Sequence, residues 1–163
     1  MAIDVSGDVL LAPLTGEPRA LQEWTTTFHL ALVVLDPFTY ESSWIIDTAV
    51  RIVRNYAEAD CRVAFLVTGT IEEARQFVGP LAKEFLVFAD PERLAVKAMG
   101  LEQLPAFVHL NQLHAIETKA EGWDPEAWHA VAERLAALMG GWRTPVIPLP
   151  SDPVPFEGTP ALG

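Results

Sequence analysis

Two uninterrupted apolar segments constrain the fold of this chain more than any other feature of its sequence. Residues 29–35 read HLALVVL and residues 63–67 read VAFLV. Short runs of this kind, rich in β-branched residues, are typical of strands buried on both faces of a parallel sheet. Both are much shorter than the roughly 18 apolar residues that a membrane-spanning helix requires. The chain is therefore expected to be an α/β protein with parallel strands at its centre.

Helical patterns follow both strands. Apolar residues recur at three- and four-residue spacing up to Tyr56, which predicts a helix that begins at Trp44. After the second strand, Thr70 and Glu73 have the spacing of a capping box, and Pro80 is expected to end or kink the helix that they start. Each strand is thus followed by a helix, as in the units that build parallel sheets.

Further elements are expected in the second half of the chain. They are a strand at residues 85–88, a short helix introduced by Asp90 and Pro91 and left through Gly100, a hairpin of residues 106–110 and 113–117, and a final helix introduced by Asp124 and Pro125. Alternating strands and helices followed by an antiparallel pair predict a mixed central sheet with helices on both faces.

The prolines divide the chain, because six of the 13 follow residue 143 in a segment with few charges. We therefore expect an N-terminal strand and lead-in over residues 1–28, a single domain over residues 29–141, and a proline-rich C-terminal arm over residues 142–163. The arm is expected to be an extended linker, a polyproline ligand with P-x-x-P spacing, or a segment that packs on its own domain or on a neighbouring subunit in a homo-oligomer.

Charge and cysteine content exclude several functions. The 11 Lys and Arg residues are scattered among 22 Asp and Glu, which makes the net charge −11, so neither nucleic acid nor an anionic membrane is expected as a partner. Asp4 and Asp8 lie where a signal peptide needs positive charge, which predicts a cytoplasmic protein. Cys61 is the one cysteine, which excludes an internal disulfide, a Cys-X-X-Cys pair and a zinc site with two thiolates. No cofactor and no metal are expected.

Four segments at the joints of these elements carry a resemblance to a known family. They read VVLDPFTYESSW from residue 33, FLVFADPERLAVKAMGL from residue 85, EQLPAFVHLNQLHAI from residue 102, and AEGW from residue 120. In this order they resemble the thioredoxin-like superfamily, in particular its peroxiredoxin-like and cytochrome-maturation thiol-reductase branches. The resemblance covers residues 29–139, about two-thirds of the chain. It implies a thioredoxin-like mixed sheet with an active-site loop at the end of the first central strand.

The chain lacks the residues on which the redox chemistry of that family depends. Aligned on the second buried strand, the family's cysteine pair falls at Tyr40 and Ser43, and the peroxiredoxin pattern places the nucleophile at Ser42. The buried carboxylate of thioredoxins falls near Val34, and residues 100–118 contain no arginine to hold a peroxide. Disulfide exchange requires a thiolate. The resemblance therefore implies a divergent member without the usual redox activity.

The candidate site is a partner-binding groove between the loop after the first central strand and the segment around Pro105. The resemblance implies that Pro105 is cis, lies opposite the loop and leaves backbone groups free to pair with an extended peptide. We thus expect a redox-inactive binding module, chaperone or assembly adaptor that holds a client polypeptide, and the negative charge favours a basic client. The residues expected to contact the client are Pro37, Phe38, Thr39, Tyr40, Glu41, Ser42, Ser43, Leu104 and Pro105.

Two serines and the cysteine leave an enzymatic alternative open. Ser42 or Ser43 is expected to cap the helix that begins at Trp44, although either could donate to an anion, or act as a nucleophile if a histidine approached through the fold. Cys61 follows two acidic residues, which disfavour a reactive thiolate. If Cys61 is reactive nevertheless, the chain is a divergent thiol-disulfide oxidoreductase or peroxidase.

The hairpin is expected to place two histidines together. If residues 111–112 form a two-residue turn, His109 faces His114 on one face of the sheet, with Cβ atoms roughly 5 Å apart. Such a pair could bind a metal or respond to pH, but no third ligand is evident, so we expect two polar side chains at an exposed hairpin tip. His29 and His129 are assigned no role.

Overall fold

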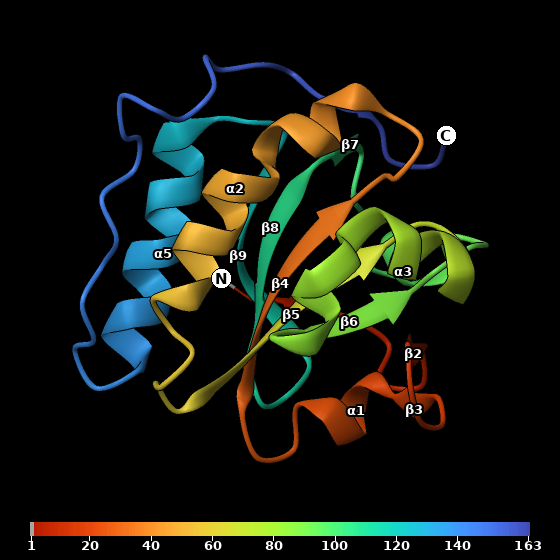
Figure 1. Ribbon diagram of the computed structural model, residues 1–163. Helices are drawn as coiled ribbons and strands as arrows, with labels where there is room; N and C mark the ends of the chain where they lie inside the picture. Colours follow the sequence, from red (N-terminus) through yellow and green to blue (C-terminus); the bar gives the residue numbers. More distant parts are fainter. Residues whose placement is uncertain (1) are drawn as a thin grey trace.

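The computed structural model describes residues 2–163, and within them a central sheet carries helices on both faces (Figure 1). The order of the sheet's eight strands in these residues is β1-β9-β8-β4-β5-β6-β2-β3. Strands β4, β5 and β6 are parallel, and β8 and β9 extend the sheet in antiparallel fashion beside β4. The predicted mixed α/β sheet is therefore confirmed. The strands are β1 (Ile3–Asp4), β2 (Leu10–Pro13), β3 (Arg19–Ala20), β4 (His29–Leu35), β5 (Cys61–Val67), β6 (Leu86–Ala89), β8 (Ala106–Leu110) and β9 (Ala115–Glu121).

The sheet separates two apolar cores, because successive side chains of the buried strands point to opposite faces. Val33 and Leu35 of β4 belong to one core, with side chains of α2, α3 and α5. Leu32 and Val34 belong to the other, with side chains of α1 and α4. The helices are α1 (Leu21–Trp24), α2 (Tyr40–Arg54), α3 (Ile71–Val78), α4 (Leu94–Ala98) and α5 (Pro125–Leu138).

Two helices begin where the sequence predicts. Thr70 Oγ1 accepts a hydrogen bond from the Glu73 backbone N–H (3.1 Å), and the Glu73 carboxylate accepts one from the Thr70 N–H (2.9 Å), which completes the capping box of α3. A short 3-10 segment that contains Pro80 follows α3. Asp124 caps α5, whose first residue is Pro125. These local signals are satisfied within a few residues of sequence and need no tertiary partner.

Helix α2 begins at Tyr40, four residues before the predicted start at Trp44. Its first turn is polar in sequence, so no apolar spacing marks it. Thr39 occupies the N-cap position with an extended backbone (φ −122°, ψ 145°), and its side chain makes no capping hydrogen bond. The prediction that Ser42 or Ser43 caps this helix is therefore wrong, because both lie inside it.

The turn between β8 and β9 spans residues 111–114 rather than the predicted two residues. The side-chain oxygen of Asn111 accepts hydrogen bonds from two backbone N–H groups of the turn and the start of β9 (2.9 and 3.1 Å), and His114 adopts a positive φ of 50°. A register shift next to His109 then places this residue opposite Thr118. The predicted pair of His109 and His114 is therefore wrong.

Residues 2–28 contain more regular structure than the expected single strand. They form three short strands and α1, and all three strands enlarge the central sheet: β1 pairs with β9, β2 pairs with β6, and β3 pairs with β2. The short helix α4 begins at Leu94, later than the Asp90-Pro91 signal suggests. The Asp90 carboxylate still accepts hydrogen bonds from the first N–H groups of α4, at Ala95 and Val96.

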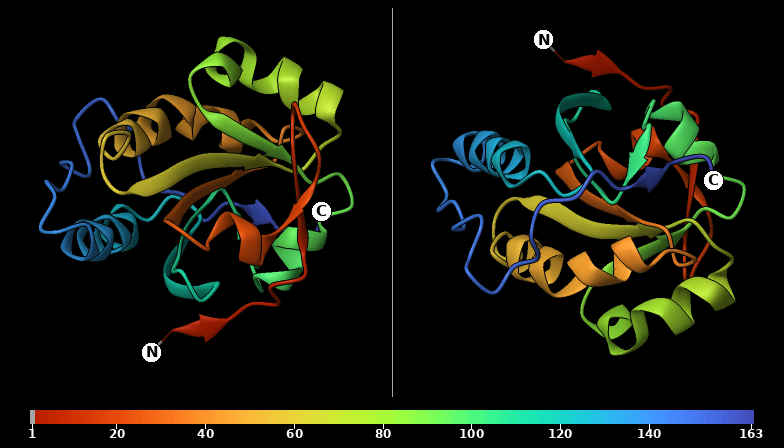
Figure 2. Two further views of the ribbon diagram at one scale, coloured as in Figure 1. Left: turned by 90° about the horizontal axis from the view of Figure 1, so that it is seen from below. Right: turned by 90° about the horizontal axis from the view of Figure 1, so that it is seen from above.

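The proline-rich arm packs on its own chain. Figure 1 shows this segment leaving α5 and crossing the end of the sheet, and Figure 2 shows it reaching the short strand β7 (Gln103–Leu104). There its last strand, β10 (Thr159–Pro160), forms a separate two-stranded sheet with β7. Of the three expected arrangements of the arm, packing on its own domain is the one observed. No helix in residues 2–163 combines the length and apolar character needed to cross a membrane.

Candidate functional site

The loop after β4 is held by hydrogen bonds to two buried side chains, those of Asp36 and Ser42. The Asp36 backbone N–H donates to Ser42 Oγ (2.8 Å), and the Phe38 N–H donates to the Asp36 carboxylate (2.9 Å). Ser42 is completely buried, whereas Ser43 is exposed and donates its hydroxyl to the Tyr40 carbonyl oxygen (2.6 Å). Ser42 therefore ties the first turn of α2 to the end of β4.

Three aromatic side chains face solvent beside this loop. The exposed fractions are 64% for Phe38, 80% for Tyr40 and 56% for Trp44. Tyr40 and Trp44 are four residues apart in α2, so they lie on the same side of the helix. Phe38 and Pro37 also line a hollow together with Phe77 of α3. Large apolar side chains that gather in the open mark contact surfaces.

The other two predicted loop residues contribute less surface. Thr39 and Glu41 are both half-buried. The Thr39 hydroxyl donates to the Asp36 carbonyl oxygen (3.3 Å), a bond within the loop itself. The exposed part of the predicted loop is therefore mainly aromatic.

Leu104 and Pro105, the second half of the predicted groove, are buried under the chain's own arm. The peptide bond between them is cis, as predicted. β7 pairs with β10 in antiparallel register, so that Leu104 lies opposite Thr159. The Pro105 carbonyl oxygen accepts a hydrogen bond from the Gly122 N–H (2.8 Å). Backbone groups that the sequence suggested were free for a client are thus occupied within the chain.

Arg93, which no sequence pattern singled out, connects the loop to the arm. Its guanidinium forms an ion pair with Asp36 (3.0 Å) and donates to the Ala161 carbonyl oxygen (2.6 Å). The two side chains of the ion pair are only 15% and 4% exposed, respectively. Arg93 has a left-handed backbone (φ 58°) just before α4. In sequence it resembles an ordinary charged residue near a helix start, so only the tertiary contacts reveal its position.

The arm is also anchored to α2. The Asp152 carboxylate accepts hydrogen bonds from the Arg51 guanidinium (2.7 Å) and the Thr48 hydroxyl (2.8 Å). Further along, the ring of Phe156 packs edge-on against Trp44 with a centroid distance of 5.7 Å. The arm therefore covers part of the aromatic surface at the start of α2 and leaves Phe38 and Tyr40 exposed.

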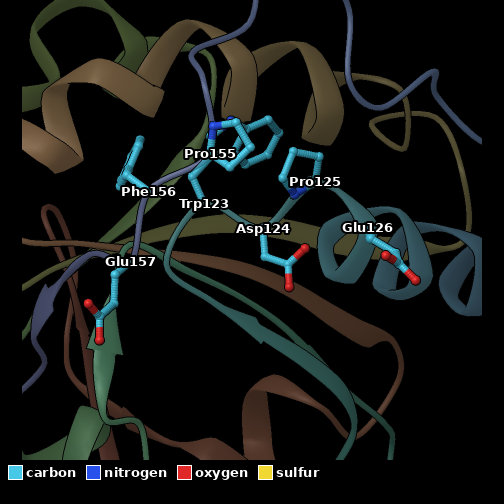
Figure 3. A pocket seen from close by; sticks show the side chains of 7 residues that line it. All are labelled: Trp123, Asp124, Pro125, Glu126, Pro155, Phe156 and Glu157. Atoms are coloured by element: carbon cyan, nitrogen blue, oxygen red, sulfur yellow. The ribbon is translucent and has the colours of Figure 1, made fainter.

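An open hollow of about 510 Å³ lies where the arm meets the start of α5 (Figure 3). Trp123 and Phe156 line it and exchange both backbone hydrogen bonds (2.8 and 3.1 Å). Three acidic side chains also line the hollow, and their negative charge favours a cationic group there. They are Asp124, Glu126 and Glu157. Within residues 2–163, no three His, Cys, Asp or Glu side chains are grouped so that they could hold a metal ion.

His109 is completely buried, so the prediction that it lies at an exposed hairpin tip is wrong. Its partner is His29, with Nε2 of His109 2.8 Å from Nδ1 of His29. Burial, and then the neighbouring His29, lower the pKa of His109 to about 4, and burial also lowers the pKa of His29. Because β4 has seven residues, its two ends are roughly 20 Å apart. The pair therefore cannot act as a base for Ser42.

Cys61 also lies at the far end of the sheet. It is the first residue of β5 and pairs in register with His29. Burial, with a smaller contribution from Asp60, raises the pKa of the Cys61 thiol to about 11. At neutral pH the thiol is therefore protonated and a poor nucleophile. The sequence suggested the same direction, but burial is the larger cause.

Comparison with known proteins identifies the fold. Neither a protein-family model nor a curated protein sequence matches the chain. A hypothetical protein of Sinorhizobium meliloti matches with a TM-score of 0.70 and 16% identity, over 99% of this chain and 94% of its own. A peroxiredoxin Q mutant of Xanthomonas campestris matches at 0.64 and 11% identity, over 86% and 98%. A secreted disulfide oxidoreductase of Mycobacterium tuberculosis, homologous to E. coli DsbE, matches at 0.60 and 16% identity, over 80% and 96%. The chain has a thioredoxin-like fold.

In this thioredoxin-like protein, the positions at which the resemblance located redox cysteines lie in the first turn of α2. They hold Tyr40, Ser42 and Ser43. The single thiol of the chain is at the opposite end of the sheet. The fold is thus shared with oxidoreductases and peroxiredoxins, whereas the sulfur chemistry at this loop is not.

Proposed function

We propose that this thioredoxin-like protein is a redox-inactive binding module, a chaperone or assembly adaptor that holds an extended segment of a client polypeptide. One observation carries the proposal: β7, beside Pro105, already pairs through its main chain with an extended segment, the chain's own strand β10. Strand addition of this kind is a general mode of peptide recognition. The exposed rings of Phe38 and Tyr40 would supply the apolar contacts of the same client.

The chemistry of the loop supports binding rather than catalysis. Ser42, in the position of the peroxiredoxin nucleophile, accepts a backbone hydrogen bond and is buried, so its oxygen is not presented to a substrate. Tyr40 and Ser43 cannot form a disulfide. The raised pKa of Cys61 keeps that thiol protonated at neutral pH.

Charge supports a basic client. The net charge of −11 attracts positively charged partners and speeds their encounter. Two acidic side chains of the domain itself, Asp124 and Glu126 at the start of α5, line the hollow next to the segment that pairs with β7. A lysine or arginine of the client would be favoured at this place.

The test is client capture with matched aromatic variants. Tyr40→Ala removes the most exposed ring of the candidate surface, and Leu113→Ala removes an exposed apolar side chain from the β8–β9 turn at the far end of the sheet. A client held at the proposed site should be captured by wild type and Leu113→Ala but lost by Tyr40→Ala. With the purified client, Tyr40→Ala should weaken binding at least about tenfold, or ~1.4 kcal/mol. Equal binding by all three chains would refute the site.

The rival function is a divergent thiol-disulfide oxidoreductase or peroxidase, which the names of two structural neighbours favour. Such an enzyme would have to use Cys61. Insulin reduction and peroxide consumption should be negligible for wild type and unchanged in Cys61→Ser. Activity that disappears on this substitution would establish the enzyme and contradict the binding module.

We further propose that the protein acts in the cytoplasm, a reducing compartment in which a single cysteine remains a thiol. One structural neighbour is described as secreted, so the compartment needs its own test. Fractionation of cells that express the tagged chain should recover it with cytoplasmic markers, and recovery in the periplasm or medium would contradict this assignment.

A further inference from the structure

The end of the arm is held as a peptide ligand would be, by main-chain hydrogen bonds along an extended segment. Phe156 exchanges two backbone hydrogen bonds with Trp123 (2.8 and 3.1 Å). β10 pairs with β7, and beyond it the Ala161 N–H donates to the Glu102 carbonyl oxygen (2.9 Å). Figure 2 shows this last strand lying beside β7. Residues 156–161 are therefore bound at both ends and in the middle.

Two side chains of this segment pack against the domain, whereas the side chains on either side of each are exposed. Ala161 is 1% exposed and belongs to the core on the α4 side of the sheet. Phe156 is half-buried and packs against Trp44. Pro160 and Leu162, on either side of Ala161, are exposed. The site thus holds a half-buried aromatic ring at one position and a buried methyl group five residues later.

A glycine is required between these two positions. Gly158 has a φ of +97°, and a Cβ at this residue would lie 2.6 Å from the Leu104 carbonyl oxygen. It would also lie 3.1 Å from the Cα atom of Gly122, which faces it from the domain. Any side chain at residue 158 would both strain the backbone and collide with the main chain of β7.

We propose that the β7 edge recognises extended peptides with the pattern aromatic–x–Gly–x–x–Ala, and that residues 156–161 occupy it as an intramolecular ligand until a client with this pattern displaces them. This inference rests on the proposed function and specifies its ligand. The aromatic ring packs edge-on against Trp44, the glycine allows close contact with the Leu104 carbonyl oxygen, and the alanine fills the buried position. Arg93 links the bound segment to the loop of the candidate site through Ala161 and Asp36.

A ligand tethered to its own site competes with any external peptide, since its effective concentration is on the order of millimolar for a short tether. The apparent affinity of an added peptide equals its intrinsic affinity multiplied by the fraction of sites that the arm leaves open. Releasing the arm should therefore strengthen peptide binding without changing the site.

The experiment uses the full chain and a fluorescent synthetic peptide of residues 155–163, PFEGTPALG. In the Ala161→Glu chain, a charge at the buried position disfavours docking of the arm. The matched control is Leu162→Glu, which adds the same charge at the exposed neighbour. Fluorescence anisotropy should show the peptide binding to Ala161→Glu at least about tenfold more tightly than to wild type or Leu162→Glu. A peptide with valine at the position of Gly158 should bind none of the chains.

Equal affinity for wild type and Ala161→Glu, or tight binding of the valine peptide, would overturn the inference. If Ala161→Glu fails to fold, excess unlabelled peptide is added to wild type and hydrogen exchange of the Ala161 N–H is followed. Faster exchange supports displacement of the arm, and unchanged exchange overturns it. The client captured through Tyr40 is titrated onto the same chains. Capture by none contradicts the proposed function, whereas equal capture by wild type and Ala161→Glu contradicts only the intramolecular ligand.

Discussion

Replacing Arg93 with methionine should destabilise the protein substantially, because it removes one partner of a largely buried ion pair. The substitution removes the contact with Asp36 (3.0 Å) and the hydrogen bond to the Ala161 carbonyl oxygen (2.6 Å). The Asp36 carboxylate, which is 4% exposed, keeps its bond from the Phe38 N–H but loses its counter-charge. Removing one partner of a buried pair costs about 3–5 kcal/mol. Because Arg93 retains some contact with water, we expect a cost of about 3 kcal/mol, at the lower end of this range.

Urea unfolding followed by circular dichroism measures this cost. With a slope of about 2 kcal/mol per molar urea, the midpoint of Arg93→Met should fall by about 1.5 M relative to wild type. The control is Arg54→Met, which breaks the solvent-exposed pair with Glu84 and should shift the midpoint far less. In the double variant with Asp36→Asn, the loss should be smaller than the sum of the two single losses, because both act on one pair. A midpoint shift no larger than that of Arg54→Met, or strictly additive losses, would refute the reasoning.

Three further outcomes are expected. In the folded state the pKa of His109 is about 4, against 6.5 for an exposed histidine, so acid protonates the unfolded chain first and favours unfolding. The free energy of unfolding should be at its full value above about pH 6.5 and fall by about 3 kcal/mol as the pH approaches 4. His109→Leu should flatten this dependence, and an unchanged slope in His109→Leu would contradict the assignment. Tyr56→Phe removes a buried hydrogen bond to the Ala132 carbonyl oxygen (2.7 Å) and should cost about 1–2 kcal/mol in urea unfolding; no loss would show that this bond contributes nothing net. The homo-oligomer through the arm that the sequence allowed is tested by light scattering: a dimer that truncation at residue 143 abolishes would support it, and a dimer that survives truncation would exclude assembly through the arm.

Local signals in the sequence predicted the helix starts whose capping hydrogen bonds join residues close together in the chain. The capping box of Thr70 and Glu73 and the Asp124 cap formed as expected, because donor and acceptor are three residues apart. The start of α2 was misplaced because its first turn is polar and its contact, from the Asp36 N–H to Ser42, is made with the preceding strand. Apolar spacing cannot reveal a contact of this kind.

The histidines show the same limit at a turn. The sequence predicted a two-residue turn at residues 111–112, with His109 and His114 opposite each other in the hairpin. The Asn111 side chain instead stabilises a longer turn, and His109 contacts His29, 80 residues earlier in the chain, through the pairing of β8 with β4. The turn length decides which residues of β9 lie opposite β8, whereas the partner of His109 is decided by the neighbouring strand β4, which the hairpin sequence does not reveal.

The sequence alone determined the central strands, the starts of α3 and α5, the thioredoxin-like resemblance and the absence of cysteine from the expected redox loop. These follow from residue type and short spacing, which are properties of the chain before it folds. Only the tertiary structure decided that the arm occupies the edge beside Pro105, that Arg93 joins Asp36 to Ala161, and that His29 and His109 are paired. Each of these contacts joins segments that are far apart in sequence, and their partners are selected by the packing of the assembled sheet and helices rather than by local preference.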